Sequence, residues 1–169
     1  MKRFLLILAL CAATLTAAAQ SGAQALLKRI EGKRVSFDYS LTTAEKVPVK
    51  HSGSAVIEGN CYRIDDNGME IWCNGKTRWT VDNVAREVYI EAPGSEAELL
   101  ISPEKLLGNV KNLVAGGTSA SGQYTGEGPG KDATFVLTSI KTSEPKGDRA
   151  EFTFSTSSLK APWVITDLR

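Results

Sequence analysis

The chain has little histidine, little cysteine and almost no net charge: one histidine, three cysteines, and 20 basic against 19 acidic residues. The only histidine, His51, lies in a predicted strand among polar neighbours, which argues against a histidine-based catalytic triad, and one histidine cannot make a histidine-rich metal site. A balanced charge leaves no basic surface of the kind that binds nucleic acid. After residue 19, no segment is apolar for long enough to span a membrane. We therefore expect no catalytic residues, no metal, no cofactor, no nucleic-acid partner and no stable membrane insertion.

The first 19 residues have the layout of a cleavable secretory signal. Two basic residues precede an apolar run from Phe4 to Ala13, and small residues at Ala17 and Ala19 precede Gln20. Removing 19 residues from 169 leaves 150, the size of one domain. We expect an exported protein whose mature part, residues 20–169, is a single monomeric domain.

Most of the mature chain has the pattern of β-strands. Residues 35–41 alternate strictly between apolar and polar side chains, which is typical of a strand with one buried face. Residues 53–91 have turn chemistry at each break and apolar or aromatic residues on both faces. A sheet that is apolar on both sides needs both of its faces covered. A bound ligand is a candidate cover for one of them. Further strands are expected at 47–57, near 123–124, and at 134–140, 150–155 and 163–168.

Two short helices are expected beside these strands. Residues 23–31 place Leu26 and Ile30 on one helical face. A second helix is predicted from Ser102, a good N-cap followed by proline, to Val114, ended by two glycines. About ten strands with a leading and an inserted helix predict a mainly β, α+β fold: a strongly curved antiparallel sheet forming an unclosed barrel covered by the helices. A plain β-sandwich is the alternative.

The hairpin around Asn67 predicts a disulfide. A three-residue loop with Gly68 in the left-handed conformation pairs Asp65 with Met69 and brings Cys61 opposite Cys73. Directly opposed residues of an antiparallel pair lie within disulfide range, and an exported compartment is oxidising. The bond would contribute up to about 3 kcal/mol. Two readings compete with it: two buried free thiols, or a two-residue Asn-Gly turn that slips the register by one.

Three short motifs resemble the periplasmic outer-membrane lipoprotein carriers of the LolA type: YRI at 62–64, NGKTRWTV at 74–81 and EV at 87–88. The resemblance covers Lys33 to Glu91, and beyond it only the order of strands and helices agrees. It implies an unclosed barrel with a hydrophobic concave face, closed by a helical lid. It also implies that the partners are acylated lipoproteins or other lipids, received from an inner-membrane donor complex and delivered to an outer-membrane acceptor.

The same resemblance raises the question of the lid latch. In the family, an arginine on the strand before the aromatic motif holds the lid helices shut, and that position falls here on Glu58 or Gly59. Arg63, further along, is the substitute candidate; an ordinary solvent-facing arginine is the alternative. For each predicted groove residue the alternative is an ordinary core position. The groove candidates are Phe37, Tyr39, Tyr62, Trp72, Trp79, Val81, Val88, Ile90, Leu26, Ile30, Leu106, Leu107 and Val110.

Two other functions compete with carriage. The same fold could serve as a periplasmic sensor or interaction module that recognises a lipid or a protein and transports nothing. Ser102 to Lys105 matches the S-x-x-K motif of acyl enzymes, but the large helical domain that such enzymes need is missing. We therefore do not expect an enzyme.

Overall fold

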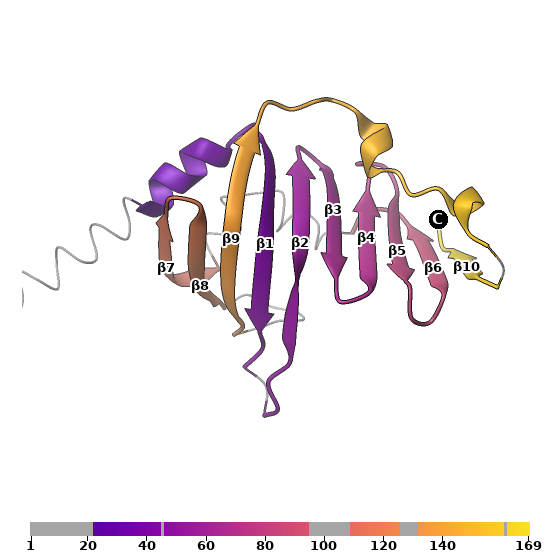
Figure 1. Cartoon of the computed structure of the whole chain (residues 1–169), viewed down its shortest axis with the longest axis horizontal. Helices are drawn as coiled ribbons and strands as arrows, with labels where there is room; N and C mark the ends of the chain where they lie inside the picture. The colour runs from indigo at the N-terminus through magenta and orange to yellow at the C-terminus, as the bar shows by residue number, and fades with distance from the viewer. Residues whose placement is uncertain (1–21, 45, 95–108, 126–131, 161) are drawn as a thin grey trace, which may run out of the picture.

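The computed structural model describes residues 22–44, 46–94, 109–125, 132–160 and 162–169. The predicted secretory signal, Ser102, Leu106 and Leu107 lie outside these ranges. The described chain folds into one ten-stranded mixed sheet that is not closed, with one α-helix, residues 22–30, at one end of it (Figure 1). The mainly β architecture and the leading helix are as the sequence predicts.

Strands that follow one another in the sequence mostly lie side by side in the sheet, because hairpins join most of them. Their order across the sheet is β10-β6-β5-β4-β3-β2-β1-β9-β8-β7 (Figure 1). The bounds are β1 Arg34–Thr42, β2 Lys50–Glu58, β3 Cys61–Asp66, β4 Met69–Cys73, β5 Arg78–Asp82, β6 Glu87–Glu91, β7 Val110–Gly116, β8 Ser119–Tyr124, β9 Thr134–Ser143 and β10 Val164–Asp167, with short 3-10 helices η1 Arg149–Phe152 and η2 Thr156–Ser158.

The pairing register sorts the side chains onto two faces, since successive residues of a strand point to opposite sides. We call one the isoleucine face. It carries Phe37, Tyr39, Ile57, Tyr62, Ile64 and Ile71 from β1 to β4. We call the other the tryptophan face. It carries Trp72, Trp79, Val81, Val88 and Ile90 from β4 to β6.

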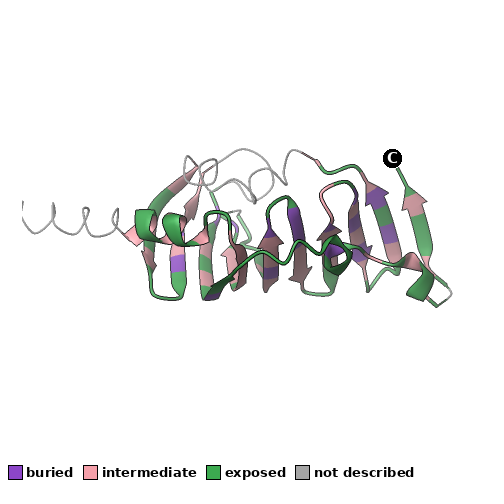
Figure 2. Cartoon of the chain, turned by 90° about the horizontal axis from the view of Figure 1, so that it is seen from above, coloured by how far each residue is buried: buried purple, intermediate pink, exposed green. Residues whose placement is uncertain are grey.

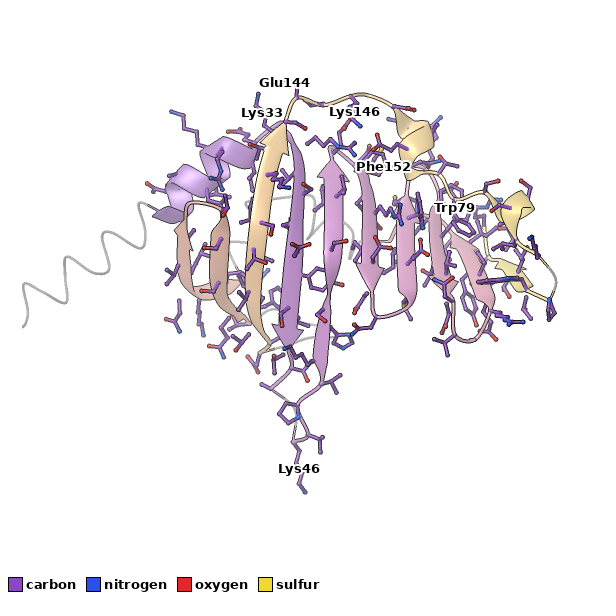
Figure 3. All side chains as sticks on the ribbon, viewed as in Figure 1. Lys33, Lys46, Trp79, Glu144, Lys146 and Phe152 are labelled. Atoms are coloured by element: carbon purple, nitrogen blue, oxygen red, sulfur yellow. The ribbon has the colours of Figure 1, made fainter. Side chains whose placement is uncertain are left out.

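The main buried core lies on the tryptophan face. Trp79, Val81, Val88 and Ile90 are buried there, and Val88 is fully excluded from solvent. Their cover is the C-terminal segment, which returns from β9 to β10 across this part of the sheet (Figure 3). The covering side chains that pack against this core are Phe154, Leu159 and Trp163.

Three expectations about the C-terminal half are wrong. Residues 150–155 form no strand, because η1 begins there, with the Asp148 carboxylate accepting from the Ala150 N–H. The helix predicted to reach Val114 does not, because β7 begins at Val110. The sheet is not purely antiparallel either: β10 runs parallel to β6. A parallel neighbour requires a long crossover, and the segment that covers the tryptophan face provides it.

The predicted disulfide is also wrong, because the hairpin turn is one residue shorter than expected. Asn67 and Gly68 both have positive φ, 47° and 94°, which makes a two-residue type I′ turn. Asp66 therefore pairs with Met69, and Cys73 lies opposite Tyr62. Cys61 is thereby directed to the other face, and both thiols are buried and free.

Candidate ligand-binding face

The isoleucine face is a continuous apolar surface across four neighbouring strands. One row across the strands joins Val35, Ile57, Tyr62 and Cys73, and the next row joins Phe37, Ala55, Ile64 and Ile71. Tyr62 and Cys73 are buried, whereas the three isoleucines that pack against them are only half-buried. This surface is therefore apolar, but its isoleucine side chains are only partly buried.

The apolar surface continues across β9 to β8 and β7. Leu137 pairs with Tyr39 and Phe135 with Leu41. Gly122 lies beside Phe135, and a Cβ there would approach the Phe135 ring at 3.0 Å and the Val110 side chain at 2.9 Å. The absence of a side chain at Gly122 thus lets the Phe135 and Val110 side chains lie over this end of the sheet.

The apolar surface ends at β4, because β5 and β6 present polar side chains to the same side. Arg78 forms an ion pair of 2.6 Å with Glu91. Tyr89 donates to Glu87 at 2.6 Å, and this hydrogen bond, followed by the charge of Glu87, raises the pKa of Tyr89. The apolar part of this face is therefore limited to the side of the sheet that runs from β4 to β7.

A polar cluster lies next to the half-buried isoleucines on the same face. Tyr39, Gly53 and Asp66 form one row across β1, β2 and β3. His51 lies two residues before Gly53, and its Nδ1 is 3.1 Å from the Asp66 Oδ2. The Tyr39 hydroxyl donates to the main-chain oxygen of Asp65 at 3.5 Å.

The predicted groove residues do not line one surface. Phe37, Tyr39 and Tyr62 lie on the isoleucine face. The other five strand candidates, Trp72, Trp79, Val81, Val88 and Ile90, lie on the tryptophan face, where four of them are buried core. Leu26 and Ile30 are half-buried on the leading helix, which contacts the β7 end through the Arg29 side chain and the Gly117 oxygen. Val110 belongs to β7 instead of a helix.

Sequence reasoning missed Ile57, Ile64 and Ile71 as candidates. Alternation singles out only Ile64, which lies between Arg63 and Asp65, because Ile57 adjoins Val56 and Ile71 adjoins Trp72. Placing the three isoleucines on one face requires the hairpin register, which the turn at Asn67 sets.

Arg63 lies on the tryptophan face, away from the isoleucines. Its guanidinium stacks on the Trp72 ring at 4.1 Å and pairs with Asp65 and Glu70 at 3.3 and 3.5 Å. Trp72 in turn contacts Phe154, with ring centroids 5.9 Å apart. Any latch made by Arg63 would therefore act on the C-terminal cover.

Glu58, which with Gly59 is one of the two positions on which the resemblance places the latch arginine, holds the same C-terminal cover at its start. The buried carboxylate accepts from Arg34 at 3.1 Å and from the Gly147 N–H at 2.6 Å. Arg34 also pairs with Glu151 at 2.6 Å, and Lys33 pairs with Glu144 (Figure 3). Burial opposes ionisation of Glu58, but the Gly147 hydrogen bond and Arg34 outweigh it and lower the pKa of Glu58.

A cavity of about 270 Å³ lies at this junction, lined by Glu58, Cys61 and Phe152 among others.

The described residues contain no group of three or more potential metal ligands. None of the described helices is long and apolar enough to cross a membrane. A scan against models of protein families found no match, and a search of curated proteins found none either.

Proposed function

We propose that the protein is a LolA-like periplasmic carrier, which binds the acyl chains of lipoproteins on the isoleucine face and delivers them toward the outer membrane. The observation that carries the proposal is the contrast in burial between the two apolar surfaces. The tryptophan face is buried under the C-terminal segment, whereas Phe37, Ile57, Ile64 and Ile71 are only half-buried. A half-buried apolar surface over the middle of a sheet suits a ligand that comes and goes.

The energetics of acyl chains favour such a surface. Each methylene exposed to water costs about 0.8 kcal/mol, so a protein with several acyl chains leaves a membrane very slowly by itself. An apolar surface in the aqueous compartment offsets much of this cost. The affinity must stay moderate, because a carrier that binds too tightly does not release its cargo.

The edge of the apolar surface adds support. The ion pair between Arg78 and Glu91 and the hydrogen bond between Tyr89 and Glu87 make β5 and β6 polar on this side. A bound hydrocarbon chain would therefore lie over β1 to β4 and β9, where its neighbours are isoleucines, Phe37 and Leu137.

Mass spectrometry of material extracted from the gently purified protein tests the proposal. We expect acyl-bearing peptides or lipids to copurify and to transfer to acceptor vesicles. Recovery of no lipid, together with a stable complex with another protein, would favour the interaction module and overturn carriage.

A matched pair of variants locates the binding surface. Ile64→Asp places a charge on the isoleucine face and should reduce binding of a fluorescent apolar probe at least tenfold. Val136→Asp makes the same change in β9, at a side chain that is 44% exposed on the opposite face, and should leave binding unchanged. Equal loss of binding in both variants would show that the effect is not specific to the isoleucine face.

A further inference from the structure

The cluster of Tyr39, His51 and Asp66 lies at a defined place on the isoleucine face. Asp66 follows Ile64 by two residues on β3, and Tyr39 follows Phe37 by two residues on β1, so these two residues lie in the next row of the same surface, and His51 lies one row further on. It is reachable from solvent: the side chain of His51 is 43% exposed and that of Asp66 is 24% exposed. An amphiphile whose chain lies on the isoleucines would bring its head group to this row.

The backbone at Gly53 lets the cluster assemble. A Cβ at this residue would lie 3.1 Å from the Tyr39 hydroxyl and only 1.7 Å from the main-chain oxygen of Asp65. Any side chain there would separate Tyr39 from β3. The phenol therefore lies beside the carboxylate of Asp66, and burial, followed by the charge of Asp66, raises the pKa of Tyr39 well above its ordinary value.

One oxygen of the Asp66 carboxylate has no hydrogen-bond donor at normal geometry, because the Tyr39 hydroxyl lies beside it but donates to the main-chain oxygen of Asp65. The Oδ2 of Asp66 faces His51 at 3.1 Å, while its Oδ1 is buried and accepts no hydrogen bond from the residues that the structure describes. A buried acceptor without a donor is costly, so such an atom favours a ligand that supplies an O–H or N–H group. A carboxylate head supplies no such donor, and its negative charge opposes that of Asp66.

We infer that Tyr39, His51 and Asp66 form a head-group site, which accepts amphiphiles whose polar head donates hydrogen bonds, a hydroxyl or an ammonium, and discriminates against free fatty acids. The inference rests on the proposed function, because it assumes that the chain of the amphiphile lies on the isoleucine face. It adds a preference to that function: the head group of the ligand carries a hydroxyl or an ammonium and not a free carboxylate.

The test compares three ligands with the same twelve-carbon chain: glycerol monolaurate, dodecylamine and laurate. Each displaces the neutral fluorescent probe N-phenyl-1-naphthylamine from the untagged protein at pH 8, below the micelle concentration of every ligand. We expect glycerol monolaurate and dodecylamine to bind at least tenfold more tightly than laurate. Asp66→Asn keeps the shape, removes the charge and adds an N–H donor, so the preference should fall below threefold.

Asp38→Asn is the matched control. Asp38 adjoins Tyr39 on β1, but it is exposed and points to the opposite face, so the same loss of charge should leave the preference unchanged. Because the chain has a single histidine, the NMR signal of the His51 imidazole reports on the site in the unsubstituted protein. We expect it to shift when glycerol monolaurate or dodecylamine binds, which keeps the test valid if Asp66→Asn does not fold.

The outcomes separate the two proposals. Equal affinity for all three ligands, or an unmoved His51 signal during probe displacement, would overturn the head-group site while leaving carriage intact. Failure of the probe and of all three ligands to bind would overturn the proposed function itself.

Discussion

The two faces of the sheet carry similar apolar residues but differ in what the rest of the chain does with them. On the tryptophan face, β4 to β6 are apolar and the C-terminal segment packs Phe154, Leu159 and Trp163 onto them. On the isoleucine face the apolar part lies on β1 to β4, shifted along the sheet, and its isoleucines stay half-buried. Figure 2 shows that buried residues gather in the strands toward the C-terminal end of the sheet. Apolar residues therefore form a buried core on the tryptophan face and a candidate ligand surface on the isoleucine face.

The largest expected effect contrasts one side chain from each face. Trp79→Ala empties a buried position under the C-terminal segment and should lower the free energy of unfolding by about 3 to 5 kcal/mol. Ile64→Ala removes a half-buried side chain and should cost only about 1 kcal/mol. Urea unfolding followed by circular dichroism measures both values. Equal losses would mean that Ile64 is an ordinary core residue and that the contrast between the faces does not hold.

A smaller loss is expected where the C-terminal cover is fixed to the sheet. Glu58→Gln keeps an acceptor for the Gly147 N–H but removes the charge that faces Arg34. We expect a loss of about 2 kcal/mol, since hydrogen bonds to charged groups are worth about 1.5 to 3 kcal/mol. Binding of the apolar probe to the isoleucine face should stay unchanged in this variant, and it serves as the internal control. Lost probe binding in this variant would show that the two faces are coupled.

The same variant has a pH signature. The pKa of Glu58 is lower in the folded protein than the ordinary value of 4.5, so its contribution is fully present above that value. It is lost as the pH falls through the lower folded pKa. Unfolding curves between pH 6 and pH 3 should therefore converge for the parent protein and Glu58→Gln at the acidic end. A stability difference between the two proteins that stays constant over this pH range would contradict the lowered pKa of Glu58.

Local signals in the sequence predicted much of the fold. The strict alternation of residues 35–41 specified β1, and the leading helix and strands β9 and β10 appeared near their expected places. The C-terminal segment was not predictable in this way, because its Phe152 and Phe154 suit a strand as well as a covering loop. What decided the outcome was a tertiary contact: these aromatics pack against Arg34 and Trp72, which lie far away in the sequence.

The candidate site was less predictable than the fold, and one turn explains why. A two-residue turn at Asn67 and Gly68, instead of three residues, moves every partner of β3 along β4 by one. The sequence does not show which face each strand presents, so the predicted groove combines residues from both faces. Strand periodicity alone cannot relate the faces of two strands until the turn between them is fixed.

That turn provides a moderate perturbation of both faces at once. Gly68 has a φ of 94°, where a Cβ is unfavourable, so Gly68→Ala should destabilise the protein by about 1 to 2 kcal/mol. Gly116→Ala is the control, because a Cβ there would meet nothing within 4 Å and its φ is not in the positive range. Thermal unfolding measures both variants. A neutral Gly68→Ala would argue for a different turn and hence for a different assignment of residues to the faces.

The smallest expected effect is no effect, and it tests the register directly. Cys61 belongs to the side of the sheet that carries Glu58 and Arg63, whereas Cys73 packs with Tyr62 on the isoleucine face, so no bond joins them. Adding a reductant should leave the urea midpoint unchanged. Both thiols should react with an alkylating reagent only after unfolding, because both are buried and burial raises the pKa of Cys61. A disulfide closing this hairpin would instead make the reductant cost up to about 3 kcal/mol. That result would restore the three-residue turn and exchange the faces on which the residues of β4 lie relative to β3.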